Sequence, residues 1–456
     1  MKAANFKKNF EIVLYSLKRG AFVNMYLHNY AISEKKIEFL RKNREEKREK
    51  YFSKLVPVMG DAAVDEVRKI YSMFDERMLI WYAGLWEPEI GGFYFSNSAR
   101  DHEGFLPDLE STYQAVSFIA EMCDLPGGEH AITKIPERFA KKISDFAYGT
   151  QDEDGWFYHK QWGKNITQTR RGRDAAAAWR LIEPLGRECK YVRATKRPVT
   201  EEKVKELPEH LQSIEAFREW LDSKDISSKS YPFGHFINST VSEIRQAGEE
   251  FVKTLIEWLN AKQYPENGLW EPEISYDAVS GLMKLGLCYP GFGATLPYSE
   301  KSFESARLAI ISSEPVEYSC QFYNAWAALG ATLVSMENEG KGEKAEEYRK
   351  KLRENAAEMI RITGEKMALA AVDDGSFAYF TYTSGKACPK SQMAEVALDN
   401  IREGDINGNG CSTKAPLTHM FKAFGIEMPP MFCPEDAEFI FELMDARVSV
   451  EKKPRP

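Results

Sequence analysis

The sequence lacks the features that mark membrane, secreted and nucleic-acid-binding proteins. No apolar run approaches the roughly 18 residues that a membrane-spanning helix requires, and no hydrophobic signal segment follows the N-terminal lysines. We therefore expect a cytoplasmic protein without a membrane partner. The 456 residues include 61 Lys and Arg against 69 Asp and Glu, which gives a net charge of −8. This balance argues against a nucleic-acid partner, because such a partner requires a basic face.

Metal and nucleotide motifs are also missing. The seven cysteines form no C-x-x-C pair, and their odd number and long spacings predict reduced thiols and no structural zinc. The segment DINGNG at 405–410 resembles the start of a calcium loop, but Pro416 stands at the twelfth position, where that loop carries a glutamate. The chain has no P-loop, no G-x-S-x-G and no G-x-G-x-x-G. We expect neither a metal nor another cofactor.

A repeat organises the chain after residue 80. The heptapeptide GLWEPEI occurs at 84–90 and again, letter for letter, at 268–274. Looser copies of a turn in which glycine precedes an aromatic residue begin at Gly92, Gly155 and Gly375. The spacings correspond to one or two units of roughly 50–60 residues, which is the length of two helices and a loop.

Stretches rich in small residues alternate with longer amphipathic helices that carry a charged face. Small residues allow the close approach that crowded inner helices need. The small-residue stretches are 111–120, 174–181, 276–285 and 322–333, and the charged helices include 251–262 and 343–366. The alternation predicts an all-α fold, specifically an (α/α)6 or (α/α)7 toroid of inner and outer helices with few short strands.

The chain divides into two predicted parts. Residues 1–80 form an N-terminal helical segment that packs on the barrel, and residues 81–450 form the catalytic toroid, with a helical insertion near 193–230. Lys, Arg and Glu alternate over 34–51, which favours a solvated helix face with a narrow apolar stripe. A basic arm for nucleic acid is the alternative for that stretch.

Polar residues at the starts of inner helices are the best candidates for a site, because loops at one end of a toroid surround a funnel. The first group is Asn97, Arg100 and His102, followed by Asp108 and Glu110. Asp108 is equally well explained as a helix N-cap.

Aromatic and basic side chains form a second group. Trp156, His159 and Trp162 precede Arg171 and Arg173. Aromatic rings suit the faces of sugars, and guanidinium groups form paired hydrogen bonds with carboxylates. Packing tryptophans and Arg–Asp pairs between helices would give the same pattern.

Two further groups have equally plain structural explanations. His235 and Asn238 follow a turn, where a histidine is at least as often a structural residue as a ligand. Trp270 and Tyr276 follow in the second copy of the repeat and just after it. Because Trp86 occupies the same place in the first copy, Trp270 is partly explained as scaffold.

The last group, Tyr323, Asn324 and Trp326, opens an alanine-rich stretch. A buried phenol or amide there needs hydrogen-bond partners. Together with the toroid pattern, segments 92–111 and 321–326 resemble the (α/α)-barrel polysaccharide lyases, with polysaccharide lyase family 38 as the nearest match. Members of that family act on glucuronan- or alginate-type chains. The resemblance is one of architecture and covers roughly residues 80–430.

The resemblance implies an enzyme that cleaves uronate-containing chains by β-elimination, with an anionic oligosaccharide or polysaccharide as its partner. It implies that Tyr323 acts as base and acid, while Asn324, His235 and Arg173 neutralise the uronate carboxylate. The expected substrate contacts are Asn97, Arg100, His102, Glu110, Trp156, His159, Trp162, Arg171, Asn238, Trp270, Tyr276 and Trp326.

These residue types suit the chemistry. The proton at C5 of a uronate is weakly acidic until positioned donors neutralise the carboxylate. A phenol has a pKa near 10 and needs a nearby cation before it acts as a base. It can then return the proton to the leaving oxygen.

Three alternatives remain open from the sequence. A glycoside hydrolase on the same toroid, including one for unsaturated uronides, would use a carboxylate pair drawn from Asp108, Glu110, Asp277 and Asp374. A helical-repeat protein without catalysis would bind partners on its concave face. A terpene cyclase is weaker still, because its aspartate-rich metal motifs are missing.

Overall fold

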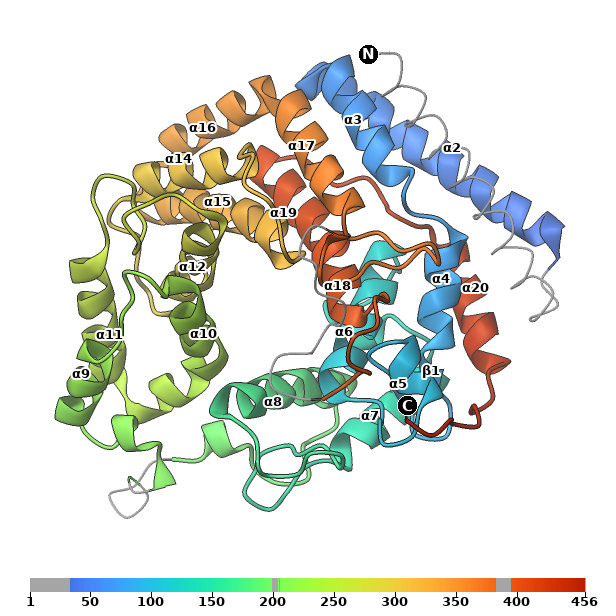
Figure 1. Ribbon diagram of the computed structural model, residues 1–456, viewed down its shortest axis with the longest axis horizontal. Coiled ribbons are helices and arrows are strands. Elements are labelled where there is room, and N and C mark those ends of the chain that lie inside the picture. The colour runs from blue at the N-terminus through green and yellow to red at the C-terminus, as the bar shows by residue number, and fades with distance from the viewer. Residues whose placement is uncertain (1–32, 199–203, 205, 383–394, 456) are drawn as a thin grey trace.

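The chain folds almost entirely into helices. The computed structural model describes residues 33–198, 204, 206–382 and 395–455, with 62% helix and 3% strand (Figure 1). The predicted all-α class with few short strands is confirmed. Within the described residues, no helix is long and apolar enough to span a bilayer.

Most of the elements are helices, and the longest connections between them separate α8 from α9 and α17 from α18. The only strands among the described residues form a two-stranded antiparallel hairpin that pairs Trp86 with Phe93. In chain order the α-helices and strands are α2 (Glu34–Met59), α3 (Asp61–Tyr71), α4 (Glu76–Gly84), β1 (Trp86–Glu87), β2 (Gly92–Phe93), α5 (Asn97–Asp101), α6 (Leu109–Met122), α7 (Glu137–Tyr148), α8 (Gln168–Ile182), α9 (Ile214–Asp222), α10 (Ser230–Ala247), α11 (Glu249–Lys262), α12 (Tyr276–Gly286), α13 (Cys288–Gly291), α14 (Ser299–Ile310), α15 (Cys320–Asn338), α16 (Gly342–Glu354), α17 (Ala356–Ala368), α18 (Ile406–Ser412), α19 (Lys414–Phe424) and α20 (Pro434–Asp445).

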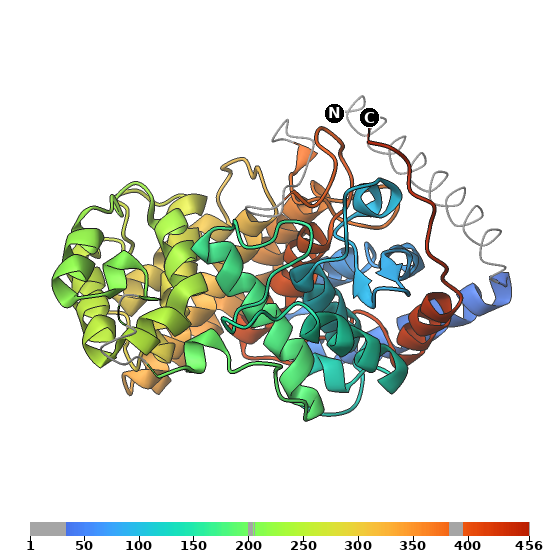
Figure 2. The same cartoon turned by 90° about the horizontal axis from the view of Figure 1, so that it is seen from below.

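The four small-residue helices α6, α8, α12 and α15 belong to a series of helices that contact one another. Helix α6 packs on α8, α8 on α10, α10 on α12, α12 on α15 and α15 on α19, while α18 contacts both α19 and α6. Charged helices pack against members of this series: α7 on α8, α11 on α10, and α14 and α16 on α15. In both ribbon views α9, α10 and α11 lie at the opposite end of the molecule from α2 and α20 (Figures 1 and 2).

Two of the repeated turns, at Gly155 and Gly375, have the same local structure, whereas the two copies of GLWEPEI differ, because Gly84 ends helix α4 and Gly268 lies outside any helix with φ of +66°. At Gly155 the amide of Asp152 donates to the carbonyl of Trp156 at 2.9 Å, and at Gly375 the amide of Val372 donates to the carbonyl of Ser376 at 2.8 Å. Both glycines have φ of +85°, in the left-handed region that side-chain-bearing residues rarely adopt. The repeat predicted from the sequence therefore recurs as a structural unit at these two turns.

The predicted N-terminal helix has a buried stripe that is not purely apolar. Helix α2 buries Ile37, Leu40 and Phe52 at helical spacing, but it also buries Arg44 and Arg48. The Arg44 guanidinium pairs with Asp436 of α20 at 3.2 Å. Part of this charged helix is thus an internal packing surface. The first 32 residues of the predicted N-terminal segment lie outside the described part of the chain.

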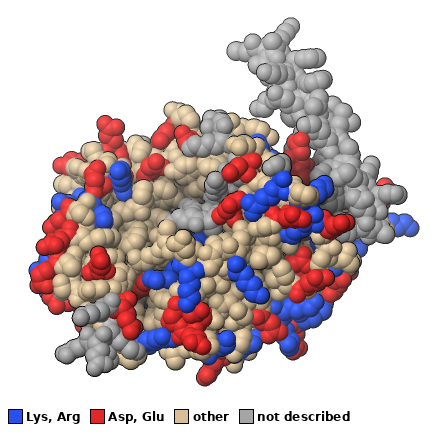
Figure 3. All heavy atoms as spheres, turned by 60° about the horizontal axis from the view of Figure 1, so that its bottom comes forward, with Lys and Arg blue, Asp and Glu red and all other residues tan. Residues whose placement is uncertain are grey.

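The predicted insertion near 193–230 contains short helices of its own. These are the 3-10 turns Ala194–Lys196 and Glu209–Leu211 and the helix α9, which packs on α11. On the face shown in Figure 3, acidic and basic side chains are interspersed, as the balanced composition suggests.

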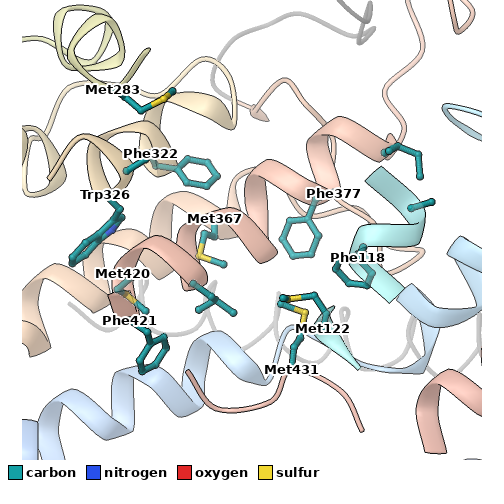
Figure 4. Packing of buried hydrophobic residues seen from close by; sticks show 14 of the residues in the cluster. Phe118, Met122, Met283, Phe322, Trp326, Met367, Phe377, Met420, Phe421 and Met431 are labelled. Carbon is teal, nitrogen blue, oxygen red and sulfur yellow. The ribbon is translucent and has the colours of Figure 1, made fainter. Parts of the chain in front are cut away.

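A continuous apolar core joins the helices. Figure 4 shows part of it, where Trp326 of α15 lies near Met420 and Phe421 of α19. The Trp326 indole N–H donates to Thr363 Oγ1 of α17 at 2.9 Å, which satisfies its polar atom inside the core. Buried Trp residues therefore tie the layers of helices together.

Candidate functional site

Tyr323 and Arg173 line the same cavity. This cavity of about 330 Å³ lies between α6, α8, α15, α18 and α19. Its lining residues are Tyr113, Gln114, Ser117, Phe118, Arg173, Tyr323, Asn407, Gly410, Cys411, Lys414, Ala415, Thr418 and His419. None of these is an Asp or a Glu, so the wall that the described residues form offers hydroxyl, amide, thiol and basic groups but no carboxylate.

The local sequence explains why Tyr323 faces this space. Tyr323 lies in the first turn of α15, where Phe322, Asn324 and Ala325 are buried and only Tyr323 is partly accessible. Its ring stacks on that of His419, with centroids 6.2 Å apart and planes at 15°. The phenol oxygen makes no hydrogen bond to a described residue, so the hydroxyl is available to a ligand.

A buried ion cluster fixes Arg173. Arg173 Nε donates to Glu110 Oε2 at 3.0 Å, and Arg170 Nη2 lies 2.7 Å from the same oxygen. Arg170 also pairs with Asp174 one helical turn away at 2.5 Å. Glu110 was predicted to touch substrate, but both of its oxygens are engaged by the arginines. It acts instead to position Arg173.

The charge state of Glu110 follows from this cluster. Burial alone would raise the pKa of the carboxyl group, but Arg173 and Arg170 outweigh burial and hold that pKa well below its usual range. Glu110 therefore stays ionised at neutral pH and is a poor proton donor.

Lys284 is a basic residue that the sequence analysis missed. It lies on α12 and is partly accessible, and its Nζ makes no hydrogen bond or ion pair with a described residue. Burial lowers the pKa of its ammonium group, and the nearby Arg173 lowers it further. One signal was available in the sequence, because Lys284 is the only charged residue between 278 and 287.

His235 belongs to the same electrostatic neighbourhood. Both ring nitrogens of this α10 residue are buried without a hydrogen-bond partner among the described residues. Burial lowers the pKa of the imidazole to about 3, with Lys284 and Arg173 adding to the effect. The ring is therefore neutral at pH 7, and its interaction with Glu110 and Arg173 places it beside the ion cluster.

Tyr323 starts from the protonated state. Burial raises the pKa of its phenol well above the usual value, and Arg173 only partly opposes this. Arg173 cannot do more, because Glu110 already neutralises most of its charge.

Asn324 does not share the cavity. It is fully buried, and its Nδ2 donates to Ser280 Oγ of α12 at 3.0 Å. The prediction that Asn324 neutralises a substrate carboxylate is corrected, because its amide joins α15 to α12 inside the wall.

Three predicted sugar contacts are core residues. Trp270 and Trp326 are fully buried, and the Trp270 indole donates to the Leu259 carbonyl at 2.8 Å. Tyr276 is also buried and accepts a hydrogen bond from Lys366 Nζ. These predictions are corrected, because side chains with satisfied partners inside the core do not reach a sugar.

The second predicted group is brought together at a different place. Arg171 stacks over the Trp156 ring at 4.3 Å and pairs with Glu243 at 2.7 Å. Trp156 lines a cavity of about 430 Å³ between α8, α10 and the loop 192–197. None of the residues lining this second cavity lines the cavity of Tyr323.

His159 and Trp162 pack on each other instead of standing free. Their ring centroids are 4.0 Å apart, and His159 Nε2 is 2.6 Å from the Pro107 carbonyl. Trp162 also lies 5.9 Å from the guanidinium of Arg170. Asn238 is exposed on α10 and donates to the Cys288 thiol at 3.5 Å.

The first predicted group lies against other segments. Arg100 pairs with the adjacent Asp101 and donates to Asn97 Oδ1 at 3.0 Å. His102 Nδ1 lies 3.0 Å from the Ser98 carbonyl, and its backbone bridges to Lys453. None of the three lines the cavity of Tyr323.

The carboxylates considered for hydrolysis do not form a pair in this cavity. Asp108 caps α6 by accepting from the Ser111 amide at 2.8 Å, and Asp374 accepts from the Ser376 amide at 3.0 Å. Asp277 accepts a hydrogen bond from the Tyr318 hydroxyl at 2.5 Å.

The glycine-rich segment 405–410 is a helix cap. Asp405 accepts from the Gly408 amide at 2.7 Å and begins α18. Comparison with protein-family models, with curated proteins and with solved structures found no match to this chain.

Proposed function

We propose that the serial helix contacts close into an (α/α)6 toroid. Helices α6, α8, α10, α12, α15 and α19 would be its inner ring, since each contacts the next and α18 bridges the last to the first. The cavity of Tyr323 would then lie inside this ring. This assignment selects the six-unit form of the two predicted from the sequence.

We propose that this cavity is the active site of a lyase acting on uronate-containing oligosaccharides. The observation that carries the proposal is that the phenol of Tyr323, which makes no hydrogen bond to a described residue, lines the same cavity as the guanidinium of Arg173, and that the described residues of this wall include no carboxylate. An anionic sugar suits such a wall, because charged donors stabilise a carboxylate in a water-poor site. The volume of about 330 Å³ is at the lower end of small-ligand sites and favours a short oligosaccharide.

The proposed reaction uses few groups. Arg173 lines the cavity, and Lys284 interacts electrostatically with Arg173 but is not among the residues that line the cavity. Together they neutralise the uronate carboxylate, which acidifies the proton at C5. The phenolate of Tyr323 removes that proton, the bond between C4 and its oxygen breaks, and the phenol returns the proton to the departing oxygen. Glu110 holds Arg173 in place but does not contact the sugar.

Hydrolysis is the weaker alternative. Glycoside hydrolases use two carboxyl groups that flank the scissile bond, and the described lining of the cavity contains none. A binding protein without catalysis would use the same cationic wall and would retain the sugar unchanged.

Product analysis tests the proposal. Elimination leaves an unsaturated uronide that absorbs in the ultraviolet, so oligoglucuronate, oligoalginate and heparinoid fragments are offered to the protein. We expect absorbance to rise with at least one of them. Tyr323→Phe is expected to lower the rate about 10²- to 10⁴-fold, the usual range for a proton-transfer group. Reducing sugar without ultraviolet absorbance would favour hydrolysis instead.

Tyr113→Phe is the matched control. Tyr113 is a phenol in the wall of the same cavity, and it contacts Arg180 at 5.4 Å. We expect this variant to retain most of the activity. Equal rates for Tyr323→Phe and the unaltered protein would remove Tyr323 from the mechanism.

A further inference from the structure

Two cysteine thiols meet beside the cavity. Cys320 is the first residue of α15 and Cys411 lies in α18, and their Sγ atoms are 3.6 Å apart although 91 positions separate them in the chain. Among the described cysteines, no other pair of thiols is in hydrogen-bonding contact. The contact therefore comes from the packing of α15 on α18.

The surroundings favour a reactive thiol at Cys320. It sits at the N-terminus of a 19-residue helix, where the helix dipole stabilises negative charge. The contact with Cys411 lowers the pKa of the Cys320 thiol, and Tyr379 and Lys284 act in the same direction against burial. Burial and the same pair contact raise the pKa of Cys411, so Cys320 carries the thiolate.

A small oxidant can reach Cys411 from the cavity, and Cys320 does not line the cavity but is in contact with Cys411. Cys411 lines the cavity of about 330 Å³ and is 7% exposed, while Cys320 is 5% exposed. Large reagents are excluded at that exposure, but a molecule of the size of hydrogen peroxide fits the cavity. Cys189 is the most accessible of the described cysteines and has no thiol partner.

We propose that Cys320 and Cys411 are a redox pair that closes to an intramolecular disulfide with hydrogen peroxide and reopens with a dithiol. The Cys320 thiolate attacks one peroxide oxygen, the O–O bond breaks, and with one proton the products are a sulfenic acid and water. The Cys411 thiol then attacks the sulfenic sulfur and releases a second water. Two thiols lose two electrons in total, and one peroxide gains them.

Formation of the disulfide requires little movement of the two side chains. A disulfide is about 2.05 Å long, so the sulfur atoms must approach each other by roughly 1.5 Å. The two helices already pack on each other, and both side chains point into the contact between them. Oxidation would also remove the contact of Cys320 Sγ with the Tyr379 hydroxyl at 3.7 Å. The inference does not depend on the proposed lyase activity.

Thiol counting and peptide mapping of the full chain test the redox pair. The reduced protein is treated with one to five equivalents of hydrogen peroxide, unfolded, and titrated with a thiol reagent. We expect the count to fall from the seven cysteines of the sequence to five and to return to seven after dithiothreitol. A non-reducing digest of the unaltered protein should contain the Cys320 and Cys411 peptides joined, with a loss of two hydrogens.

Variants separate the pair from the other cysteines. Cys320→Ser is expected to keep all six remaining thiols at the same peroxide dose. Cys411→Ser should lose one thiol, as a sulfenic acid at Cys320 without a disulfide, and Cys189→Ser should still lose two. The digest of the unaltered protein decides the matter even if a serine variant fails to fold. The proposal is overturned by a disulfide to Cys388 or Cys189, by sulfinic acid at Cys320 with Cys411 intact, or by seven thiols surviving five equivalents.

Discussion

Removal of the Glu110 charge should destabilise the protein in a pH-dependent way. Glu110 is 12% exposed and pairs with the fully buried Arg170 and with Arg173. Glu110→Gln leaves Arg170 with Asp174, whereas Arg173 loses the carboxylate with which it pairs. Breaking a buried ion pair from one side costs about 3–5 kcal/mol, because an uncompensated charge stays behind.

The size of the effect on melting can be worked out from chain length. The entropy of unfolding is about 2.1 cal/mol/K per residue near 60 °C, or roughly 1 kcal/mol/K over 456 residues. A loss of about 3–5 kcal/mol therefore lowers Tm by about 3–5 °C if the chain unfolds as one unit. Differential scanning calorimetry at pH 7 measures this shift directly.

The sign of the pH dependence follows from the depressed pKa of Glu110. The stabilisation by this carboxylate is fully present above the unfolded pKa, near 4.3, and is lost as pH falls toward the folded value. The Tm gap between the unaltered protein and Glu110→Gln should stay constant from about pH 7 to 5.5 and narrow below about pH 4.

A matched substitution on the same helix provides the control. Glu121 pairs with Lys414 at 2.7 Å, but its side chain is 42% exposed, so Glu121→Gln should cost less than about 1 kcal/mol. If the Tm of Glu110→Gln lies within about 1 °C of the unaltered protein, or is as high as that of Glu121→Gln, the buried ion cluster does not stabilise the wall of the cavity.

Two predictions concern Lys284, which interacts electrostatically with Arg173, and the phenol that lines the cavity. Lys284→Met should weaken the binding of glucuronate about 10- to 100-fold in calorimetric titration, since a charge-assisted hydrogen bond contributes about 1.5–3 kcal/mol. An unchanged affinity would show that Lys284 does not bind the carboxylate. Burial raises the pKa of Tyr323, so the fraction of phenolate should rise about tenfold per pH unit up to at least pH 9, and kcat/KM should rise with it. A plateau of kcat/KM below pH 8 would contradict the role of Tyr323 as the base.

The repeat and the all-α class could be predicted from the sequence because both depend on local spacing. GLWEPEI recurs letter for letter, and Trp86 and Trp270 are both buried. The same equivalence could have removed Trp270 from the candidate sugar contacts. A residue that occupies the same place in both copies of a repeat is more simply explained by packing. The small-residue stretches predicted as crowded helices did become α6, α8, α12 and α15.

The roles of individual polar residues could not be predicted from the sequence, because they depend on partners that are distant along the chain. Glu110 meets Arg173 across 63 positions, and Asn324 meets Ser280 across 44. Spacing along the sequence cannot tell a carboxylate that contacts substrate from one that two arginines already hold. Arg44 is a similar case, since it is buried in a stripe that otherwise carries apolar residues.

The charges around the cavity support an anionic ligand more strongly than any single residue does. Arg170 and Arg173 are balanced by Glu110 and Asp174, which are ionically bonded to them. Lys284 has no such carboxylate among the described residues, and its ammonium group loses hydration on burial, which lowers its pKa. A bound carboxylate would compensate that charge, raise the pKa of Lys284 and so release free energy that a neutral sugar cannot. Lys284 is not among the residues that line the cavity, but it interacts electrostatically with Arg173. We therefore expect its charge to add to the preference for uronates over neutral sugars, while Arg173, already neutralised, orients the group that binds.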